Sequence, residues 1–152
     1  MYDICRFIKK IKENQAKSFE VYHGRGKMMA VCGVVHRKGR VLVCKRGAGM
    51  LFPGFWELPT ETLEDGETVE NALERAFFER LTACPRRMSP LGAVNFSFGE
   101  GFRLLAYGVE LCKNFFHVYG YDDFRWIKLR DLRRLRLLEP HVTLLTQLNH
   151  EL

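Results

Sequence analysis

Charged side chains gather in residues 54–83 at spacings that suit phosphate or metal chemistry. The turn Glu64-Asp65-Gly66-Glu67 places three carboxylates directly before residues 68–83, a stretch with neither glycine nor proline that predicts a helix. Carboxylates in the first turn of a helix gain about 0.3–1 kcal/mol from its dipole. The turn is therefore equally typical of an ordinary solvated helix start. Other residues are needed to distinguish this interpretation from a phosphate or metal site.

The predicted helix carries charges close to its apolar side. Its apolar stripe consists of Val69, Ala72, Leu73, Ala76 and Ala83. Glu79 and Arg80 fall on or beside this stripe, so we expect both side chains to point toward a sheet. Arg75 and Glu79 are four residues apart and can also pair as on any helix surface. Charges on a packed face indicate a functional site.

The elements that must position this helix are mostly strands. Met28 to His36 is typical of a buried strand, Lys38-Gly39 of a turn, and Val41 to Arg46 of the hairpin partner. Further strands are expected over residues 91–98, 102–112 and 124–127, and further helices over residues 1–15, 129–135 and 141–149. This order predicts the α/β fold class, with a mixed β-sheet sandwiched between helices.

Length and composition restrict the class of protein. The chain has 152 residues, which predicts one domain of ordinary size. Its longest nearly pure apolar run, Met28 to Val35, is far shorter than the about 20 residues that cross a bilayer, so we expect no membrane partner. The N-terminus lacks the pattern of a secretory signal, which favours a cytoplasmic location.

Cysteine usage and net charge add two expectations. The 5 cysteines are scattered and include no C-x-x-C pair, so we expect reduced thiols that fill the core. The net charge of +6 favours acidic partners such as nucleotides or nucleic acid.

Residues 54–83 resemble the box of the Nudix hydrolase family, G-x5-E-x7-R-E-U-x-E-E-x-G-U, in which U is aliphatic. Glu67 and Arg75 fix the register, and the lead-in Gly54-Phe55-Trp56-Glu57-Leu58-Pro59 matches what commonly precedes the box. The resemblance covers roughly residues 28 to 149. It implies a Nudix-like domain over residues 28–152, a small N-terminal helical extension over residues 1–27, and a structural tie between Glu67 and Arg75.

The departures from the box fall on the residues that carry its chemistry. Glu61 stands where the box opens with glycine, Ala76 and Arg80 replace two glutamates, and Thr82 replaces the closing glycine. Of the three helical carboxylates that hold metal in the family, only Glu79 remains. A guanidinium about 5 Å from a divalent ion costs roughly 7 kcal/mol at an effective dielectric near 20, so an inward Arg80 excludes metal from the usual place.

Two functions are compatible with these residues. The first is a Nudix-type hydrolase that cleaves the pyrophosphate bond of nucleoside diphosphate-linked substrates with Mg²⁺ or Mn²⁺ at an impaired, displaced site. Its catalytic residues would be Glu79 and Glu61, with Asp122 and Asp123 as further metal ligands. The second is a catalytically inactive module that binds a nucleotide or RNA and needs no metal, because a guanidinium binds phosphate by itself.

Residues for substrate and partner binding complete the expectations. The candidates for holding substrate or its phosphates are Arg46, Trp56, Arg80 and His141, the last at the position where MutT-like members place a base-reading asparagine. Basic residues cluster between Arg125 and Arg136, which leaves RNA contact open beside a plain solvated amphipathic helix. The sequence indicates no oligomeric state.

Overall fold

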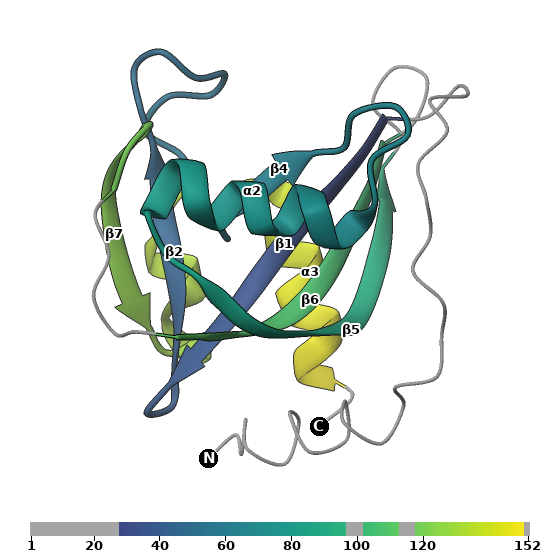
Figure 1. Ribbon diagram of the computed structural model, residues 1–152. Coiled ribbons are helices and arrows are strands. Elements are labelled where there is room, and N and C mark those ends of the chain that lie inside the picture. The colour runs from purple at the N-terminus through teal and green to yellow at the C-terminus, as the bar shows by residue number, and fades with distance from the viewer. Residues whose placement is uncertain (1–27, 97–101, 113–117, 151–152) are drawn as a thin grey trace.

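The computed structural model describes residues 28–96, 102–112 and 118–150 (Figure 1). The helix expected over residues 1–15 and the extension over residues 1–27 lie outside these ranges, so the proposed division of the chain remains a prediction. No helix among the residues described is long and apolar enough to span a membrane.

Within the residues described, seven strands form one sheet with the order β3-β2-β1-β6-β5, while β4 pairs with β1 and β7 pairs with β2. The strands are β1 (Met28–Arg37), β2 (Arg40–Arg46), β3 (Trp56–Glu57), β4 (Thr60–Thr62), β5 (Pro85–Phe96), β6 (Phe102–Leu111) and β7 (Tyr121–Ile127). Only β1 and β6 run parallel to each other; the other pairs among these strands are antiparallel. The mixed sheet agrees with the predicted fold class.

The hairpin of β1 and β2 opens beyond its turn. Its two strands pair only at His36↔Val41 and Arg37↔Arg40, and then diverge (Figure 1). Within the opening, β3 pairs with β2 and β4 pairs with β1, so residues 57–60 pass from one half of the sheet to the other. The Gly33 amide donates to the Pro59 carbonyl at 2.9 Å and fixes this crossing segment. The candidate site is built around it.

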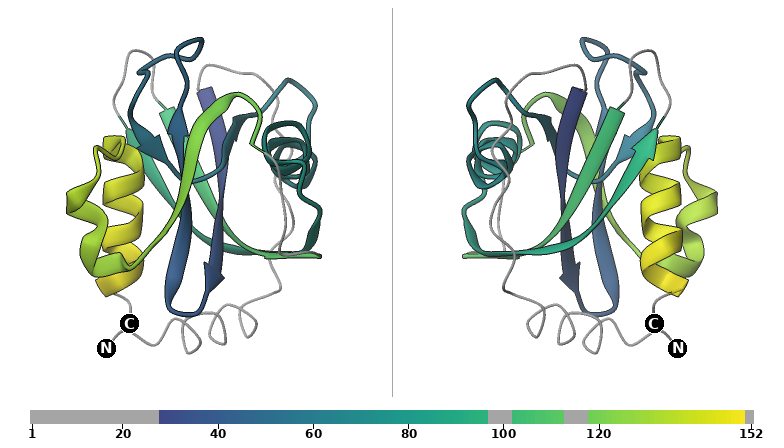
Figure 2. Two further views of the ribbon diagram at one scale, coloured as in Figure 1. Left: turned by 90° about the vertical axis from the view of Figure 1, so that its left-hand side faces the viewer. Right: turned by 90° about the vertical axis from the view of Figure 1, so that its right-hand side faces the viewer.

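Helices cover both faces of the sheet (Figure 2). The helix α2 (Val69–Leu81) lies on one face, and α3 (Glu139–His150) with the 3₁₀ helix η1 (Leu129–Arg134) lies on the other. Each face has its own apolar core: Phe77 of α2 is fully buried in one, and Leu144 of α3 in the other. This is the predicted sandwich.

Local sequence explains where α2 begins and how closely it approaches the sheet. Thr68 caps the helix, because its hydroxyl accepts a hydrogen bond from the Asn71 amide at 3.2 Å. Thr82 ends it in the left-handed conformation, with φ of 51°. A Cβ on Gly33 would lie 2.5 Å from the Phe77 ring, so glycine is required for the helix to pack here.

Several sequence-based expectations need correction. The strand expected from Leu91 begins at Pro85 and contains Pro90, because β5 is an edge strand in which a missing amide is tolerated. The helix expected over residues 129–135 is a 3₁₀ helix. Of the cysteines expected in the core, Cys32 and Cys44 are buried, whereas Cys84 and Cys112 are exposed. The strands β3 and β4 were not expected, since they are only 2 and 3 residues long.

Candidate functional site

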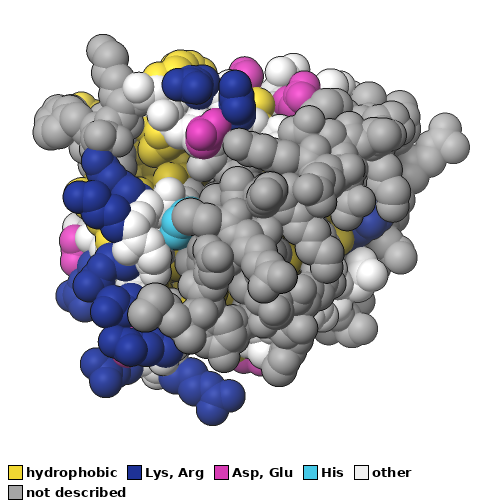
Figure 3. Space-filling view, turned by 90° about the horizontal axis from the view of Figure 1, so that it is seen from below, with side chains coloured by type: hydrophobic (Ala, Val, Ile, Leu, Met, Phe, Trp, Pro, Cys, Tyr) yellow, Lys and Arg dark blue, Asp and Glu magenta, His cyan; other side chains and the backbone are white. Residues whose placement is uncertain are grey.

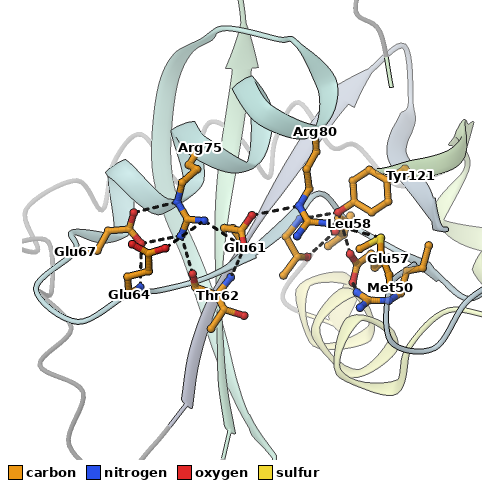
Figure 4. A network of polar contacts seen from close by, with 12 residues as sticks. Met50, Glu57, Leu58, Glu61, Thr62, Glu64, Glu67, Arg75, Arg80 and Tyr121 are labelled. Carbon is orange, nitrogen blue, oxygen red and sulfur yellow. Dashed lines mark hydrogen bonds and ion pairs between the residues drawn. The ribbon is translucent and has the colours of Figure 1, made fainter. Parts of the chain in front are cut away.

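Arg75 fastens the acidic turn to α2. Its guanidinium donates to both carboxylate oxygens of Glu67, at 3.2 and 3.0 Å, and to the Thr62 carbonyl at 2.9 Å (Figure 4). Hydrogen bonding to Arg75 lowers the pKa of Glu67, and the same bond raises the pKa of Arg75. The Glu67 and Arg75 pair is thus a structural clamp, as the resemblance implies.

Arg80 lies five residues further along α2 and points toward the sheet. Its Nε is 3.2 Å from Glu61 Oε2, its guanidinium carbon is 5.5 Å from the centre of the Tyr121 ring, and Nη1 is 3.7 Å from the Met50 sulfur (Figure 4). Burial opposes the charge of Arg80, but Tyr121 and Glu61 outweigh it and raise the pKa. The site therefore holds a permanent positive group.

Glu61 stands between the two guanidinium groups. One carboxylate oxygen faces Arg80, and the other lies 3.5 Å from Arg75 Nη1 and accepts from the Thr62 amide at 3.1 Å. Only 12% of its side chain is exposed. Both oxygens are already engaged by positive or donating groups, which makes Glu61 a poor ligand for a cation.

The contacts of Glu61, Glu67, Arg75 and Arg80 form a first polar network. A second polar network is centred on Glu57. Glu57 is 2% exposed and accepts hydrogen bonds from Arg46 at 2.7 Å and from the Tyr121 hydroxyl at 2.9 Å. Burial raises the pKa of Glu57, against the opposing effect of Arg46. Since the same Tyr121 hydroxyl accepts from the Thr60 amide at 3.3 Å and its ring faces Arg80, Tyr121 joins the two networks.

His141 closes the second network from α3. It is 3% exposed, and its Nδ1 accepts a hydrogen bond from the Leu58 amide at 3.3 Å. Burial, assisted by Arg46, lowers the pKa of His141 to about 3. The ring is therefore neutral and carries its proton on Nε2, which lies 3.8 Å from Glu57 Oε2. His141 thus fixes the crossing segment to α3.

The expected orientation of Glu79 is wrong. Arg80 lies near the centre of the buried arc of α2, with Ala76 one turn before it, whereas Glu79 is about 100° around the helix and is exposed. The Arg75 side chain turns to Glu67 and Glu61 rather than to Glu79. The last family carboxylate therefore lies outside the network.

The other candidate residues have different contacts, and among them Arg46 belongs to the network around Glu57. Asp122 and Asp123 are exposed on β7, and Asp123 lies 3.7 Å from Arg125. Arg46 bonds to Glu57 and to the Leu51 carbonyl, which shapes the loop between β2 and β3. Trp56 is 5% exposed, and its ring is covered by Arg125 at 4.9 Å.

The residues described do not fit the family metal. Ala76 has no donor atom, Arg80 is a cation, and Glu61 is occupied by two guanidinium groups. Within residues 28–96, 102–112 and 118–150, no three His, Cys, Asp or Glu side chains lie close enough together to hold an ion. Glu79, Glu61, Asp122 and Asp123 are thus not assembled into one site.

Sequence reasoning missed Tyr121 and the role of Glu57. Glu57 lies within a motif that was recognised, but its burial was not apparent from the motif. Tyr121 has no local signal, because its contacts are with residues 57 and 60, which lie more than 60 positions earlier in the chain.

Comparison with known proteins agrees with this architecture. A NUDIX domain family model matches residues 30–147, so the chain belongs to the Nudix family. It is 25% identical over 134 residues to a nucleoside triphosphatase NudI of an Enterobacter species, covering 77% of this chain and 93% of that protein.

Solved structures share the fold. A MutT NUDIX hydrolase from Burkholderia pseudomallei aligns with TM-score 0.71 and 24% identity, over 80% of this chain and 97% of that one. The NUDIX domain of Shewanella oneidensis NrtR, solved in complex with ADP ribose, aligns with TM-score 0.66 and 18% identity over 99% of both chains.

Proposed function

We propose that this Nudix-family chain binds a nucleoside diphosphate derivative through Arg80, and that binding requires no divalent metal. The observation that carries the proposal is the place of Arg80, whose side chain points inward from α2 and lies 3.2 Å from Glu61. The family holds its cation on this face of the helix. A cationic side chain there attracts the same diphosphate directly.

The geometry of Arg80 suits an anion. A guanidinium carries five N–H donors in a rigid plane and can grip phosphate with two of them at once. Within the described part of the chain, one donor goes to Glu61 and one to the weakly accepting Met50 sulfur. The Tyr121 ring orients the plane, and 26% of the Arg80 side chain remains exposed to an incoming ligand.

The neighbouring clamp supports this assignment. Arg75 is held by Glu67 and by the Thr62 carbonyl, so the acidic turn stays fixed on the helix without any metal. The fold of the site therefore does not depend on the ion that the family uses. A binding module needs only this fixed frame and one partly exposed cation.

Metal-dependent hydrolysis is the competing function. Two observations favour it. The relative NudI is named a nucleoside triphosphatase, and Glu79 matches one of the metal-binding glutamates of the family box. Repulsion between Arg80 and a divalent ion about 5 Å away would, however, cost roughly 7 kcal/mol of binding free energy at an effective dielectric near 20. The loss of a general base alone lowers a rate by about 10²–10⁴.

A turnover panel separates the two functions. Nucleoside triphosphates, nucleotide sugars and dinucleoside polyphosphates are incubated with the protein and Mg²⁺ or Mn²⁺, and phosphate or pyrophosphate release is measured beside equilibrium binding of each compound. We expect binding without turnover, unchanged by chelator. Turnover that disappears in Glu79→Gln would establish the hydrolase and overturn the proposal.

RNA contact is the other partner class, and it rests on a separate surface. Lys and Arg side chains gather along one side of the molecule (Figure 3), and residues 38, 40, 125, 130, 133, 134 and 136 are exposed basic residues. Two of these are already neighbours of carboxylates, Arg134 of Asp131 at 3.5 Å and Arg125 of Asp123 at 3.7 Å. RNA retention that falls steeply with salt and is lost in Arg133→Ala/Arg134→Ala would favour this use.

A further inference from the structure

Cys84 and Cys112 face each other where β5 and β6 meet at one end of the sheet. Cys84 directly precedes β5 and Cys112 directly follows β6, in continuation of the pair Pro85↔Leu111. The Cys112 amide donates to the Cys84 carbonyl at 2.9 Å. The two sulfur atoms are 3.4 Å apart, with the Cys112 thiol directed at the Cys84 sulfur.

These two thiols differ from the other cysteines that the structure describes. Cys32 and Cys44 are buried, and burial raises the pKa of both, so their thiols are protonated and shielded from reagents. Cys84 and Cys112 are exposed. Of the described thiols, it is therefore this pair that a dissolved oxidant reaches.

The backbone holds the pair at a distance that a disulfide accepts. Residues directly opposed in antiparallel strands have Cα atoms about 4.5–5.5 Å apart, and a disulfide accepts about 4.4–6.8 Å. The sulfurs must approach from 3.4 Å to about 2.05 Å, a change that small side-chain rotations supply. No movement of the strands is needed.

Both neighbours of Cys84 along the chain are also fixed. On one side Ala83 is buried and its amide donates to the Phe77 carbonyl at 3.0 Å, and on the other side Pro85 enters the ladder of β5. The entropy of bringing the two thiols together is thus already lost on folding. Such preorganisation makes the intramolecular reaction much faster than reaction with a second molecule in solution.

We propose that Cys84 and Cys112 are a modification site that forms a reversible intramolecular disulfide when it is oxidised by a peroxide or by a low-molecular-weight disulfide. With a low-molecular-weight disulfide, one thiolate attacks a sulfur atom and releases one small thiol, and the second thiolate then attacks the resulting mixed disulfide and releases the other. With hydrogen peroxide, one thiolate attacks an oxygen atom and gives a sulfenic acid and hydroxide. The second thiol then displaces the sulfenic oxygen as water, so two thiols and one peroxide give one disulfide and two waters. A dithiol reductant reverses the reaction. The inference is independent of the proposed ligand.

The experiment oxidises the folded protein carrying Cys5→Ser, so that no thiol outside the described residues competes. Protein is treated with hydrogen peroxide or oxidised glutathione, remaining thiols are alkylated, and peptides are mapped by mass spectrometry. We expect one crosslinked peptide joining Cys84 to Cys112, and its loss on reduction. The midpoint of thermal unfolding is expected to rise by roughly 5–10 °C on oxidation.

Matched single variants supply the control. Cys84→Ser and Cys112→Ser each remove one of the two thiols that the disulfide needs, so oxidised glutathione should leave a stable mixed disulfide on the other thiol that the parent does not accumulate. The parent measurement alone decides the proposal if either variant fails to fold. A stable mixed disulfide on Cys84 or Cys112 of the folded parent, or equal crosslinking to Cys32 or Cys44, would overturn it.

Discussion

Arg80 and Glu61 face each other across the gap between α2 and β4, with Nε 3.2 Å from Oε2. The same carboxylate reaches Arg75 through its other oxygen at 3.5 Å. A position that carries a metal-binding glutamate in the family thus carries a cation here, and a glycine position carries the carboxylate that orients it. The charges of the two side chains now present, one positive and one negative, balance each other.

Glu67→Gln should destabilise the fold because it weakens the bidentate bond to Arg75. We expect the free energy of unfolding to fall by about 1–3 kcal/mol, below the cost of breaking a fully buried ion pair, since the pair is partly exposed. Urea unfolding at neutral pH measures the difference. Glu64→Gln is the control, because Glu64 is 76% exposed and lies 4.0 Å from Arg75, and it should change stability by less than about 0.5 kcal/mol.

Gly33→Ala should lower stability by about 1–3 kcal/mol, since the added Cβ would lie 2.5 Å from the Phe77 ring and force α2 away from the sheet. Thermal unfolding followed by circular dichroism measures the change. Gly49→Ala is the matched control, because nothing lies within 4 Å of its added Cβ. Equal effects of the two variants would contradict the close packing of the Phe77 ring against Gly33.

Stability should depend on the protonation of His141. The folded pKa, about 3, lies below the ordinary value of 6.5, so the unfolded chain binds this proton first. The contribution is fully present above pH 6.5 and is lost by up to about 1.4 kcal/mol per pH unit as the pH falls toward 3. The raised pKa of Glu57 acts in the opposite direction in the acidic part of this range, because there the folded state binds the extra proton.

The measurement for this prediction is urea unfolding at pH 8, 6.5 and 5.5, which spans the range in which the histidine of the unfolded chain takes up its proton. His141→Gln cannot take up the proton, so its unfolding free energy should vary less across this window than that of the parent. A variant with the same pH dependence as the parent would show that another group is responsible.

Arg80→Glu should create affinity for a divalent cation. The substitution replaces the inward cation by a carboxylate beside Glu61, which removes repulsion and adds a ligand. We expect Mn²⁺ to bind at least about tenfold more tightly than to the parent, as followed by the electron paramagnetic resonance signal of free Mn²⁺. A parent that binds Mn²⁺ as tightly as the variant would contradict the stated role of Arg80.

The sequence predicts the local features of this molecule better than its long-range contacts. The hairpin turn at Lys38-Gly39 and the helix that follows the acidic turn are encoded within a few residues, and the structure confirms both. Glu79 and Arg80 were not distinguished, because adjacent positions at the edge of an apolar stripe are resolved only when the sheet is in place.

Contacts between distant segments explain the remaining differences. The Tyr121 bond to Glu57 spans 64 positions, and the Cys84 and Cys112 pair spans 28. Neither follows from periodicity, since each depends on the register between strands. The cysteine spacing alone therefore favoured separate core thiols, whereas the pairing of β5 with β6 brings two of them together at the surface.

The most direct test of the account is equilibrium binding of ADP-ribose in the presence of chelator, measured by isothermal titration calorimetry for the parent, Arg80→Gln and Arg87→Gln. Arg87 is the control because it lies on β5, with 61% of its side chain exposed, and contacts Glu110 rather than the site. We expect the parent and Arg87→Gln to bind ADP-ribose with the same affinity. Arg80→Gln should lose about tenfold or more in affinity, because it removes a charge-assisted hydrogen bond to the diphosphate. Binding that requires Mg²⁺ or Mn²⁺, or that is unchanged in Arg80→Gln, would contradict the central claim.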